Sequence, residues 1–406
     1  MNRIWKLLAA AVCLTVLSCG KPDGDDGQDW TSHVDTTVPA LQKKYELEAS
    51  KDFNGMVNEL TAGLKVNLYD TKHYADNERI LSVSFTAESG DIVGSYSDGT
   101  FTGGGSTVTM EWASDDPVNV PRVGRKETPG EFGILCLPGN FKGKFTVRTD
   151  RYTYTFSTIL ALEAGKAKEV DLDFSKPDVQ PTRKVGVMGD SISTFDGAMC
   201  NPDYSPFYPG SDPNVSSTDA TAKAKAVDSK EKTYWWRLIY NYMEHGELDV
   251  NSSWSGTRVV HEVKTGRSTK KSIGAGFVDR AYDFVDPDII VIHGGTNDHN
   301  QSTPVGTYDF SHPIGQLDEA LYRSAYIKLI KMLQNRYEGV QLIIIIGDRL
   351  SSPYESSTLE IAKHFGIPYV DFVGVTVEKC SGSHPTAPAF DMMAKTIHDK
   401  LIDYLP

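Results

Sequence analysis

Two short segments, far apart in the chain, carry side chains that could together perform nucleophilic catalysis. Gly189-Asp190-Ser191 ends an apolar run that begins at Lys184, and His384-Pro385 comes just before the last helical pattern. A serine hydroxyl is a weak nucleophile until a base takes its proton. A serine at a strand end also lies beside the free N–H groups of the following helix, which favour negative charge. We therefore predict Ser191 as a nucleophile and His384 as its base.

The elements around these segments alternate between strands and helices, which is typical of a parallel α/β sheet. Strands are expected at 184–188, 247–251, 288–293, 340–346 and 367–371, and helices at about 233–244, 276–285, 316–337, 356–365 and 387–403. The carboxyl ends of parallel strands meet at one edge of the sheet, where α/β proteins bind ligands. A polar insertion at about 196–232 is long for a connecting loop, so we expect a lid or a substrate-binding feature.

Two more polar segments follow strands of this sheet, Asn251 to Thr257 after the second and Gly294 to Asp298 after the third. In chain order, the Gly-Asp-Ser, Gly, Gly-Thr-Asn-Asp and His-Pro blocks resemble the four-block arrangement of the SGNH (GDSL-type) hydrolases. The resemblance covers residues 184 to 406. It implies that 183–406 form a flavodoxin-like three-layer α/β/α domain with a parallel sheet.

The resemblance also implies an ester hydrolase that works through an acyl-enzyme and uses no cofactor and no metal ion. Attack on an ester carbonyl creates an oxyanion, which needs preset hydrogen-bond donors. The resemblance assigns these donors to the backbone N–H groups of Ser191 and Gly256 and to the side-chain amide of Asn297. Pro385 opens the final helix, which would help to hold His384 in place.

One position departs from the family pattern, which places an aspartate three residues before the catalytic histidine. That position is Ser381, so the carboxylate that would orient the imidazole is absent from its usual place. Three interpretations stay open: a dyad oriented by a backbone carbonyl or by Ser381, a carboxylate supplied by Glu378 or Asp371, or a weakened enzyme. We favour a working dyad or a substituted triad, because nucleophile, base and oxyanion donors are all present.

Other residues near the blocks have structural interpretations beside the functional ones. Four of them are expected to support the backbone or the core: Asp190, His293, Asp298 and His299. Three aromatic residues of the insertion could stack on sugar rings or equally pin the loop to the domain: Tyr204, Phe207 and Tyr208. Trp254, beside Gly256, is expected to line the pocket.

The first residues have the pattern of a secretory signal, with positive charge followed by a short apolar run. Val16-Leu17-Ser18-Cys19 resembles a bacterial lipobox, in which Cys19 would be lipidated. We therefore predict a lipoprotein signal peptide at 1–19 and a flexible tether at 20–45. The acidic residues after Cys19 resemble the surface-export signal of Bacteroidetes lipoproteins. They predict an outer-membrane lipoprotein at the cell surface, which meets the membrane only through its lipid.

Residues 46–176 have the texture of an all-β module, with alternating runs between turns rich in Gly, Asp, Ser and Pro. Strands are expected at 64–69, 80–85, 106–112, 133–137, 144–148 and 168–174. The pattern predicts a β-sandwich. The stretch from Leu137 to Phe174 is similar to fimbrillin-like modules of Bacteroidetes surface lipoproteins, which implies a spacer or a binding module. A linker at 175–182 separates it from the α/β region.

Charge and cysteine content narrow the class of protein. The chain of 406 residues has a formal net charge of -13, which argues against a nucleic-acid partner. Beyond the signal, three cysteines remain: Cys136, Cys200 and Cys380. We expect buried or free thiols, with a Cys200–Cys380 disulfide as the alternative.

Together these features predict a surface-anchored serine esterase that acts on an acylated small molecule or polysaccharide. Acetyl groups on a carbohydrate fit the compartment best. One alternative is a lipid or general carboxylesterase, which predicts an apolar insertion, whereas 196–232 is polar. The other is a non-catalytic glycan-binding protein with a degenerate hydrolase site, for which Ser381 is the strongest argument.

Overall fold

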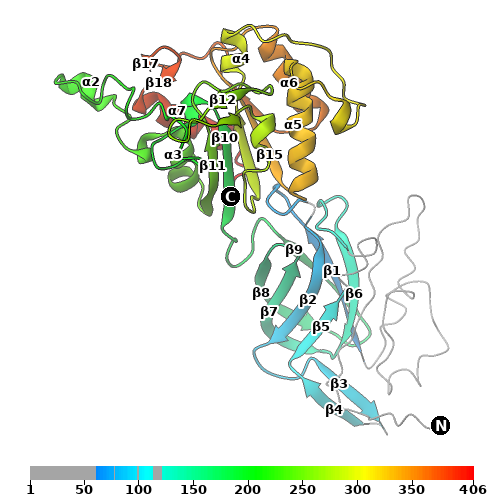
Figure 1. Cartoon of the computed structure of the whole chain (residues 1–406). Coiled ribbons are helices and arrows are strands. Elements are labelled where there is room, and N and C mark those ends of the chain that lie inside the picture. Colours follow the sequence, from blue (N-terminus) through cyan, green and yellow to red (C-terminus); the bar gives the residue numbers. More distant parts are fainter. Residues whose placement is uncertain (1–60, 77, 98–99, 113–120) are drawn as a thin grey trace. The chain divides into compact units, whose positions relative to one another are not determined.

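The computed structural model divides the chain into two compact units, Met1–Pro181 and Thr182–Pro406 (Figure 1). It describes residues 61–76, 78–97, 100–112 and 121–406. The expected signal peptide (1–19) with Cys19, the expected tether (20–45) and the first part of the expected β module (46–60) lie outside the described residues. Among the residues that are described, no helix is long and apolar enough to cross a membrane.

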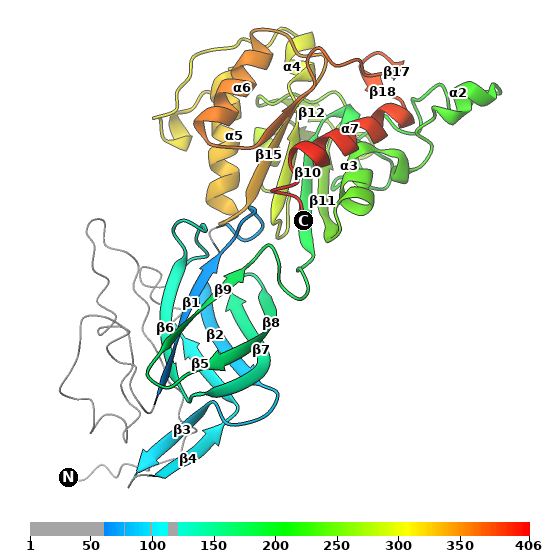
Figure 2. The ribbon, with the colours of Figure 1, turned by 180° about the vertical axis from the view of Figure 1, so that it is seen from behind.

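The first unit is a β-sandwich of two sheets (Figures 1 and 2). One sheet has the strand order β6-β1-β9 and consists of β1 (Ala62–Tyr69), β6 (Gly130–Cys136) and β9 (Ala167–Asp173). The other has the order β5-β2-β7-β8 and consists of β2 (Ile80–Ala87), β5 (Thr107–Glu111), β7 (Gly139–Thr149) and β8 (Thr153–Leu162). A separate hairpin pairs β3 (Val93–Ser97) with β4 (Thr100–Gly105).

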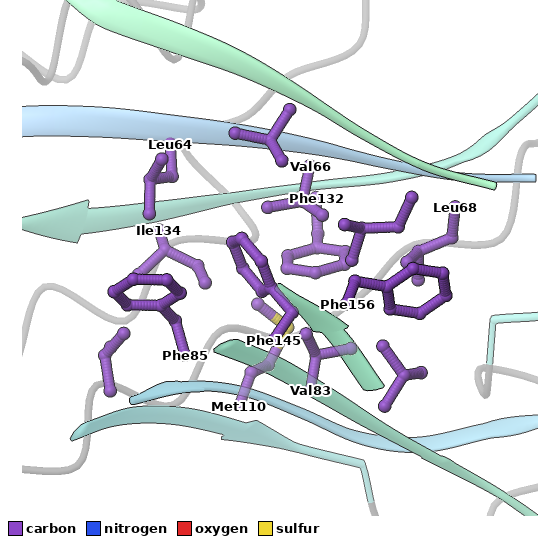
Figure 3. Close-up of a cluster of buried hydrophobic side chains, with 14 of the residues drawn as sticks. Leu64, Val66, Leu68, Val83, Phe85, Met110, Phe132, Ile134, Phe145 and Phe156 are labelled. Carbon is purple, nitrogen blue, oxygen red and sulfur yellow. The ribbon is translucent and has the colours of Figure 1, made fainter. Parts of the chain in front are cut away.

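Alternation along the strands builds the core between these sheets. In β7 every second residue from Phe141 to Thr149 is buried, so one face of the strand meets the core. Phe85 of β2 and Phe145 of β7 are fully buried with ring centroids 4.9 Å apart. Figure 3 shows side chains of the other sheet, such as Val66 and Ile134, in the same cluster. The unit confirms the predicted all-β sandwich.

The second unit is built on a five-stranded parallel sheet with the order β11-β10-β14-β15-β16. The strands are β10 (Arg183–Gly189), β11 (Gly246–Ser253), β14 (Ile289–His293), β15 (Gln341–Ile346) and β16 (Tyr369–Asp371). The second strand in the sequence therefore lies at one edge, followed by the first, third, fourth and fifth. This is the flavodoxin-like order that was predicted.

Helices cover both faces of this sheet. One face carries α3 (Tyr234–Arg237), η5 (Leu238–Tyr242) and α7 (Ala387–Lys400), and the other carries α5 (Tyr322–Arg336) and α6 (Tyr354–His364) (Figure 2). In β14, Ile289 and Val291 join the apolar cluster of α3 and α7. The intervening Ile290 and Ile292 join the cluster of α5 and α6. Because both faces are covered, the strand is apolar throughout, and the three layers are those predicted.

Short elements surround the carboxyl ends of the strands. They are η3 (Ser191–Ser193), α2 (Ala220–Ala224), η4 (Lys230–Lys232), β12 (Val263–Thr265), β13 (Ser272–Gly274), α4 (Thr296–Asn300), η7 (Ile314–Gln316), β17 (Lys379–Ser381) and β18 (His384–Pro385). Both views draw α4, β12 and the β17–β18 hairpin at the same end of the sheet (Figures 1 and 2). The connections, and not the sheet itself, carry the polar blocks.

One expected helix does not form. Within 276–285 the chain makes only the 3-10 turn η6 (Val278–Arg280). The Arg280 side chain is buried, and its guanidinium donates hydrogen bonds to three backbone carbonyls, those of Gly189, Ser252 and Ala275. A side chain that binds buried carbonyls at the ends of two strands in this way favours a turn, whereas a surface helix would leave it in solvent.

Candidate active site

The register of the parallel sheet brings three of the polar blocks to one edge. Gly189, the last residue of β10, pairs with Ser253 at the end of β11 and with His293 at the end of β14. The three loops that follow therefore begin side by side, at the switch point where ligands bind in such sheets. They carry the predicted nucleophile and oxyanion donors: Ser191, Gly256 and Asn297.

Ser191 opens η3 and is 7% exposed. Asp190 caps this turn, because its Oδ1 accepts a hydrogen bond from the Ile192 N–H at 3.0 Å. The turn needs glycine at 189, where a Cβ would lie 2.5 Å from Ser193 Oγ. The Ser191 N–H is the first of η3 and so has no acceptor within the helix. Asp190 thus supports the turn, and Ser191 offers both a hydroxyl and an N–H.

His384 lies within hydrogen-bond distance of this hydroxyl. The distance between His384 Nε2 and Ser191 Oγ is 2.8 Å, although 193 positions separate the residues in the sequence. His384 belongs to β18, which pairs with β17 immediately before α7. Thr386 caps α7 and so fixes where the histidine loop ends. The structure brings the predicted nucleophile and the predicted base together.

The second nitrogen of the imidazole faces the main chain. His384 Nδ1 lies 3.1 Å from the carbonyl oxygen of Ser381. The carboxylate of Glu378 binds Lys and Thr side chains, and that of Asp371 accepts from the backbone two residues further on. Of the three interpretations left open, this geometry matches the dyad oriented by a backbone carbonyl.

The surroundings keep the His384 imidazole neutral. Burial lowers its pKa to about 4, and the positive charge of Lys379 acts in the same direction. Two groups act in the opposite direction and raise the pKa: the Ser381 carbonyl, which accepts from Nδ1, and the Asp212 carboxylate. At neutral pH the ring therefore carries one proton. If that proton is on Nδ1, donated to the Ser381 carbonyl, Nε2 is free to accept the proton of Ser191 Oγ. The arrangement can activate the serine as a nucleophile.

The two other predicted oxyanion donors lie on loops that are fixed by further contacts. The Asn297 amide donates to the Thr257 carbonyl at 2.9 Å and lies 3.3 Å from Asp190 Oδ2. Gly256 has a φ of 74°, a left-handed conformation that glycine adopts without strain. Its carbonyl accepts a hydrogen bond from the Lys264 ammonium of β12. The Lys264 contact fixes the orientation of the loop from which the Gly256 N–H projects.

Arg280 ties the Ser191 loop to the Gly256 loop, and the sequence analysis did not single it out. The side chain is 1% exposed, and its guanidinium donates to the carbonyls of Gly189 and Ser252 and to Thr257 Oγ1. Burial lowers the pKa of Arg280 to about 10, so it stays charged at neutral pH. Buried arginines are rare, and the helix expected at about 276–285 gave no sign of this one.

The remaining polar residues beside the blocks have structural places. Asp298 is buried and accepts a hydrogen bond from the Val259 N–H at 2.8 Å, and burial raises its pKa to about 7. His293 is 1% exposed, and burial lowers its pKa to about 3. His299 Nε2 lies 2.9 Å from Ser351 Oγ. The contacts of Asp298 and His299 and the burial of His293 fit the supporting roles expected for these residues.

The aromatic residues of the insertion face inward. Tyr208 is fully buried, and Tyr204 is 8% exposed and stacks on Trp254 with ring centroids 4.6 Å apart. Trp254, itself 4% exposed, also lies under the Arg280 guanidinium, so it does not present its face to a pocket as expected. Phe207 is half-buried and stacks on the imidazole of His384. The contacts favour the interpretation in which these residues pin the insertion.

The cysteines near the site are free thiols, so the alternative Cys200–Cys380 disulfide is not formed. Cys200 Sγ donates to the Asp283 carboxylate at 3.2 Å. Cys380 Sγ donates to the His384 carbonyl at 3.4 Å. Burial raises the pKa of both thiols to about 11, which keeps them protonated.

Comparison with known proteins places this site in a family. Residues 183–401 match the family described as GDSL-like Lipase/Acylhydrolase. One similar solved structure is described as a putative GDSL-like lipase from Bacteroides uniformis; it is 26% identical, with 54% of this chain and 96% of that chain covered and a TM-score of 0.45. Another, described in the same way, is from Bacteroides ovatus; it is 24% identical, with 54% of this chain and 98% of that chain covered and a TM-score of 0.45. A family two carbohydrate esterase of Clostridium thermocellum, solved with cellohexaose, is 15% identical over 86% of this chain and 94% of that chain, with a TM-score of 0.33. No curated protein matches the chain.

The electrostatic surroundings can be tested by titrating the histidine side chains in NMR spectra. We expect His384 to titrate near pH 4, because burial disfavours the imidazolium. His261 is the matched control, because its hydrogen bond to Asp279 raises its pKa above 6.5. The pKa values of the two histidines should therefore be shifted in opposite directions from 6.5. Assignment by His384→Gln and His261→Gln would identify the resonances. A His384 that titrates at or above pH 6.5 would contradict this description of the site.

Proposed function

Because the chain belongs to the GDSL-like lipase/acylhydrolase family, we propose that Ser191 and His384 hydrolyse esters through an acyl-enzyme and that the natural substrate is an acetylated carbohydrate. The observation that carries the proposal is the 2.8 Å contact between Ser191 Oγ and His384 Nε2 at the carboxyl edge of the sheet. A serine that close to a neutral imidazole is arranged for activation by a general base.

In the first half of the proposed reaction, Ser191 Oγ attacks the ester carbonyl carbon while its proton passes to His384 Nε2. The carbonyl electron pair moves onto oxygen, and the N–H groups of Ser191 and Gly256 with the Asn297 amide would bind this oxyanion. The hydrogen bond from the Asn297 amide to Asp190 is long, at 3.3 Å, so this N–H can donate to the oxyanion instead. Collapse of the intermediate breaks the bond to the alcohol oxygen, which takes the proton from Nε2.

In the second half, a water molecule attacks the acyl carbon and gives its proton to His384 Nε2. The second tetrahedral intermediate collapses, Ser191 Oγ takes the proton back, and the carboxylic acid leaves. Throughout, Nδ1–H donates to the Ser381 carbonyl, which keeps the tautomer in which Nε2 accepts. A carbonyl carries no net charge, so it supports the imidazolium less than a carboxylate would.

The insertion favours a small acyl group on a water-soluble substrate. Within 196–232, all of which the structure describes, no large apolar side chain is exposed. Lipases that work at a lipid surface need an exposed apolar patch to meet it. The polar insertion therefore supports a short acyl group such as acetyl over a long acyl chain.

We also propose the setting in which this chemistry occurs. The lipobox ending in Cys19 and the acidic stretch after it support a lipid-anchored protein on the outer surface of the outer membrane. The first unit resembles a fimbrillin-like module and would act as a spacer or as a glycan-binding module. Polysaccharides are the acylated polymers that an enzyme in that location meets.

The anchor can be tested in cells. We expect Cys19→Ala to abolish labelling with radioactive palmitate and to release the protein from the membrane fraction, because no lipid would remain to hold it. Cys136→Ala, which removes a cysteine elsewhere in the chain, serves as the control and should stay labelled. Continued labelling and membrane association of Cys19→Ala would contradict the anchor.

The esterase activity can be tested with the protein lacking residues 1–19. We expect hydrolysis of 4-nitrophenyl acetate, slower hydrolysis as the acyl chain lengthens, and release of acetate from acetylated oligosaccharides. Ser191→Ala and His384→Ala should each lower kcat by about 10³-fold or more. Ser193→Ala is the matched control, since its hydroxyl bonds Tyr234 and not the histidine.

Two results would change the proposal. Faster hydrolysis of 4-nitrophenyl octanoate than of the acetate would replace the carbohydrate substrate with a lipid. An absence of hydrolysis on every ester tested would overturn the esterase and favour the non-catalytic glycan-binding alternative. That alternative then predicts retention on immobilised polysaccharide.

Substitutions at position 381 can show whether the side chain or the backbone carbonyl of this residue orients His384. We expect Ser381→Ala to leave kcat within about twofold, because Nδ1 of His384 contacts the Ser381 carbonyl and not the hydroxyl. Ser381→Asp is the companion variant, and a large gain in kcat would show that a carboxylate orients the imidazole better than the carbonyl does. A loss of about tenfold or more in Ser381→Ala would contradict the backbone assignment.

A further inference from the structure

The ring of Phe207 lies flat against the imidazole of His384. Their centroids are 3.4 Å apart and their planes differ by 2°. Tyr208 approaches the same imidazole edge-on, at 6.0 Å and 77°. Because the Phe207 ring covers one face of the imidazole, rotation of the imidazole about its own Cβ–Cγ bond would drive it into that ring. The insertion thus restricts the orientation of the predicted base.

The same segment of the insertion is bonded to both loops of the dyad. The Phe207 N–H donates to Thr194 Oγ1 at 2.9 Å, and that hydroxyl donates to the Ser191 carbonyl at 2.9 Å. On the other side, the Tyr208 hydroxyl donates to the Pro385 carbonyl at 2.9 Å. Hydrogen bonds of Phe207 and of the neighbouring Tyr208 therefore fix the position of Phe207 relative to both Ser191 and His384.

Other groups around the histidine give a positive charge on it little support. Lys379 disfavours the imidazolium, and Asp212 favours it to a smaller extent. The Asp212 carboxylate already accepts hydrogen bonds from the Val227 and Asn214 N–H groups. The face of an aromatic ring attracts a cation electrostatically without accepting the proton of Nδ1.

We propose that Phe207 is a positioning residue that performs part of the work of the carboxylate missing from position 381, a role that rests on the proposed esterase function. The Ser381 carbonyl fixes the edge of the imidazole at Nδ1, and Phe207 fixes its plane, so that Nε2 points at Ser191 Oγ. When Nε2 takes the serine proton, the π electrons of Phe207 lie against the new imidazolium and stabilise it. The insertion is then part of the catalytic apparatus.

Three variants test this role: Phe207→Leu, which removes the π face but stays apolar, Phe207→Tyr, which restores it, and Tyr204→Leu, which removes an aromatic ring of the same insertion that stacks elsewhere. Circular dichroism would first check that each is folded. The measurements are kcat and KM on 4-nitrophenyl acetate, the rate at which a fluorophosphonate labels Ser191, and the NMR shifts of the His384 ring protons.

For Phe207→Leu we expect roughly a tenfold loss in kcat and in the labelling rate, which is the scale of one cation–π contact plus lost orientation, with KM within about twofold. The His384 ring protons should move downfield, because the ring current of Phe207 is gone. Phe207→Tyr should restore kcat, the labelling rate and the His384 shifts to the values of the wild type. Tyr204→Leu should leave the His384 shifts unchanged.

The outcomes separate this role from the esterase proposal. If the wild type neither hydrolyses esters nor reacts with the fluorophosphonate, the proposed function fails and the catalytic role of Phe207 fails with it. If the wild type reacts and Phe207→Leu reacts equally fast, only the positioning role is overturned. A rise in KM with unchanged kcat would overturn it as well, since it would make Phe207 a substrate contact.

Discussion

A single buried positive charge holds the functional edge of the second unit together. The Arg280 guanidinium binds the last carbonyl of β10, a carbonyl of β11 and the hydroxyl of Thr257, and it lies against the faces of Trp254 and Phe277. Each hydrogen bond to a charged group is worth about 1.5–3 kcal/mol when its partners are buried. Because these partners lie beside Ser191 and Gly256, the spacing of the predicted nucleophile and of one predicted oxyanion donor depends on a side chain that would not itself touch the substrate.

The predicted base is held neutral before reaction. Burial lowers the pKa of His384 to about 4. Burial also raises the pKa of Asp190 to about 6, although the charges of Arg280 and Lys264 lower it. A histidine with so low a pKa is a weak base, so the proton transfer from serine is costly unless the resulting charges are stabilised at once. In the proposed reaction, these charges would be stabilised by the predicted oxyanion donors and by the groups around the imidazole.

The sequence alone predicted the elements with a periodic apolar pattern and the site residues that directly follow a strand. Apolar runs such as Ile289 to Ile292 predicted buried parallel strands, and the register of those strands brings Ser191 near Asn297 without further information. The helix expected at 276–285 was wrong because the Arg280 side chain binds carbonyls at strand ends far away in the sequence. The stacking of Phe207 on His384 was equally hidden, since nothing local to either residue indicates the other. Contacts of this kind depend on the tertiary fold and leave no periodic trace.

The use of a main-chain oxygen to orient the histidine has an evolutionary consequence. A carboxylate partner is lost by one nucleotide change, but the carbonyl of residue 381 is present whatever amino acid the codon specifies. Position 381 is thereby released from selection for charge and can drift while the dyad keeps its geometry. Surveys that score members of this family as inactive from a missing aspartate would discard chains in which a backbone carbonyl orients the histidine.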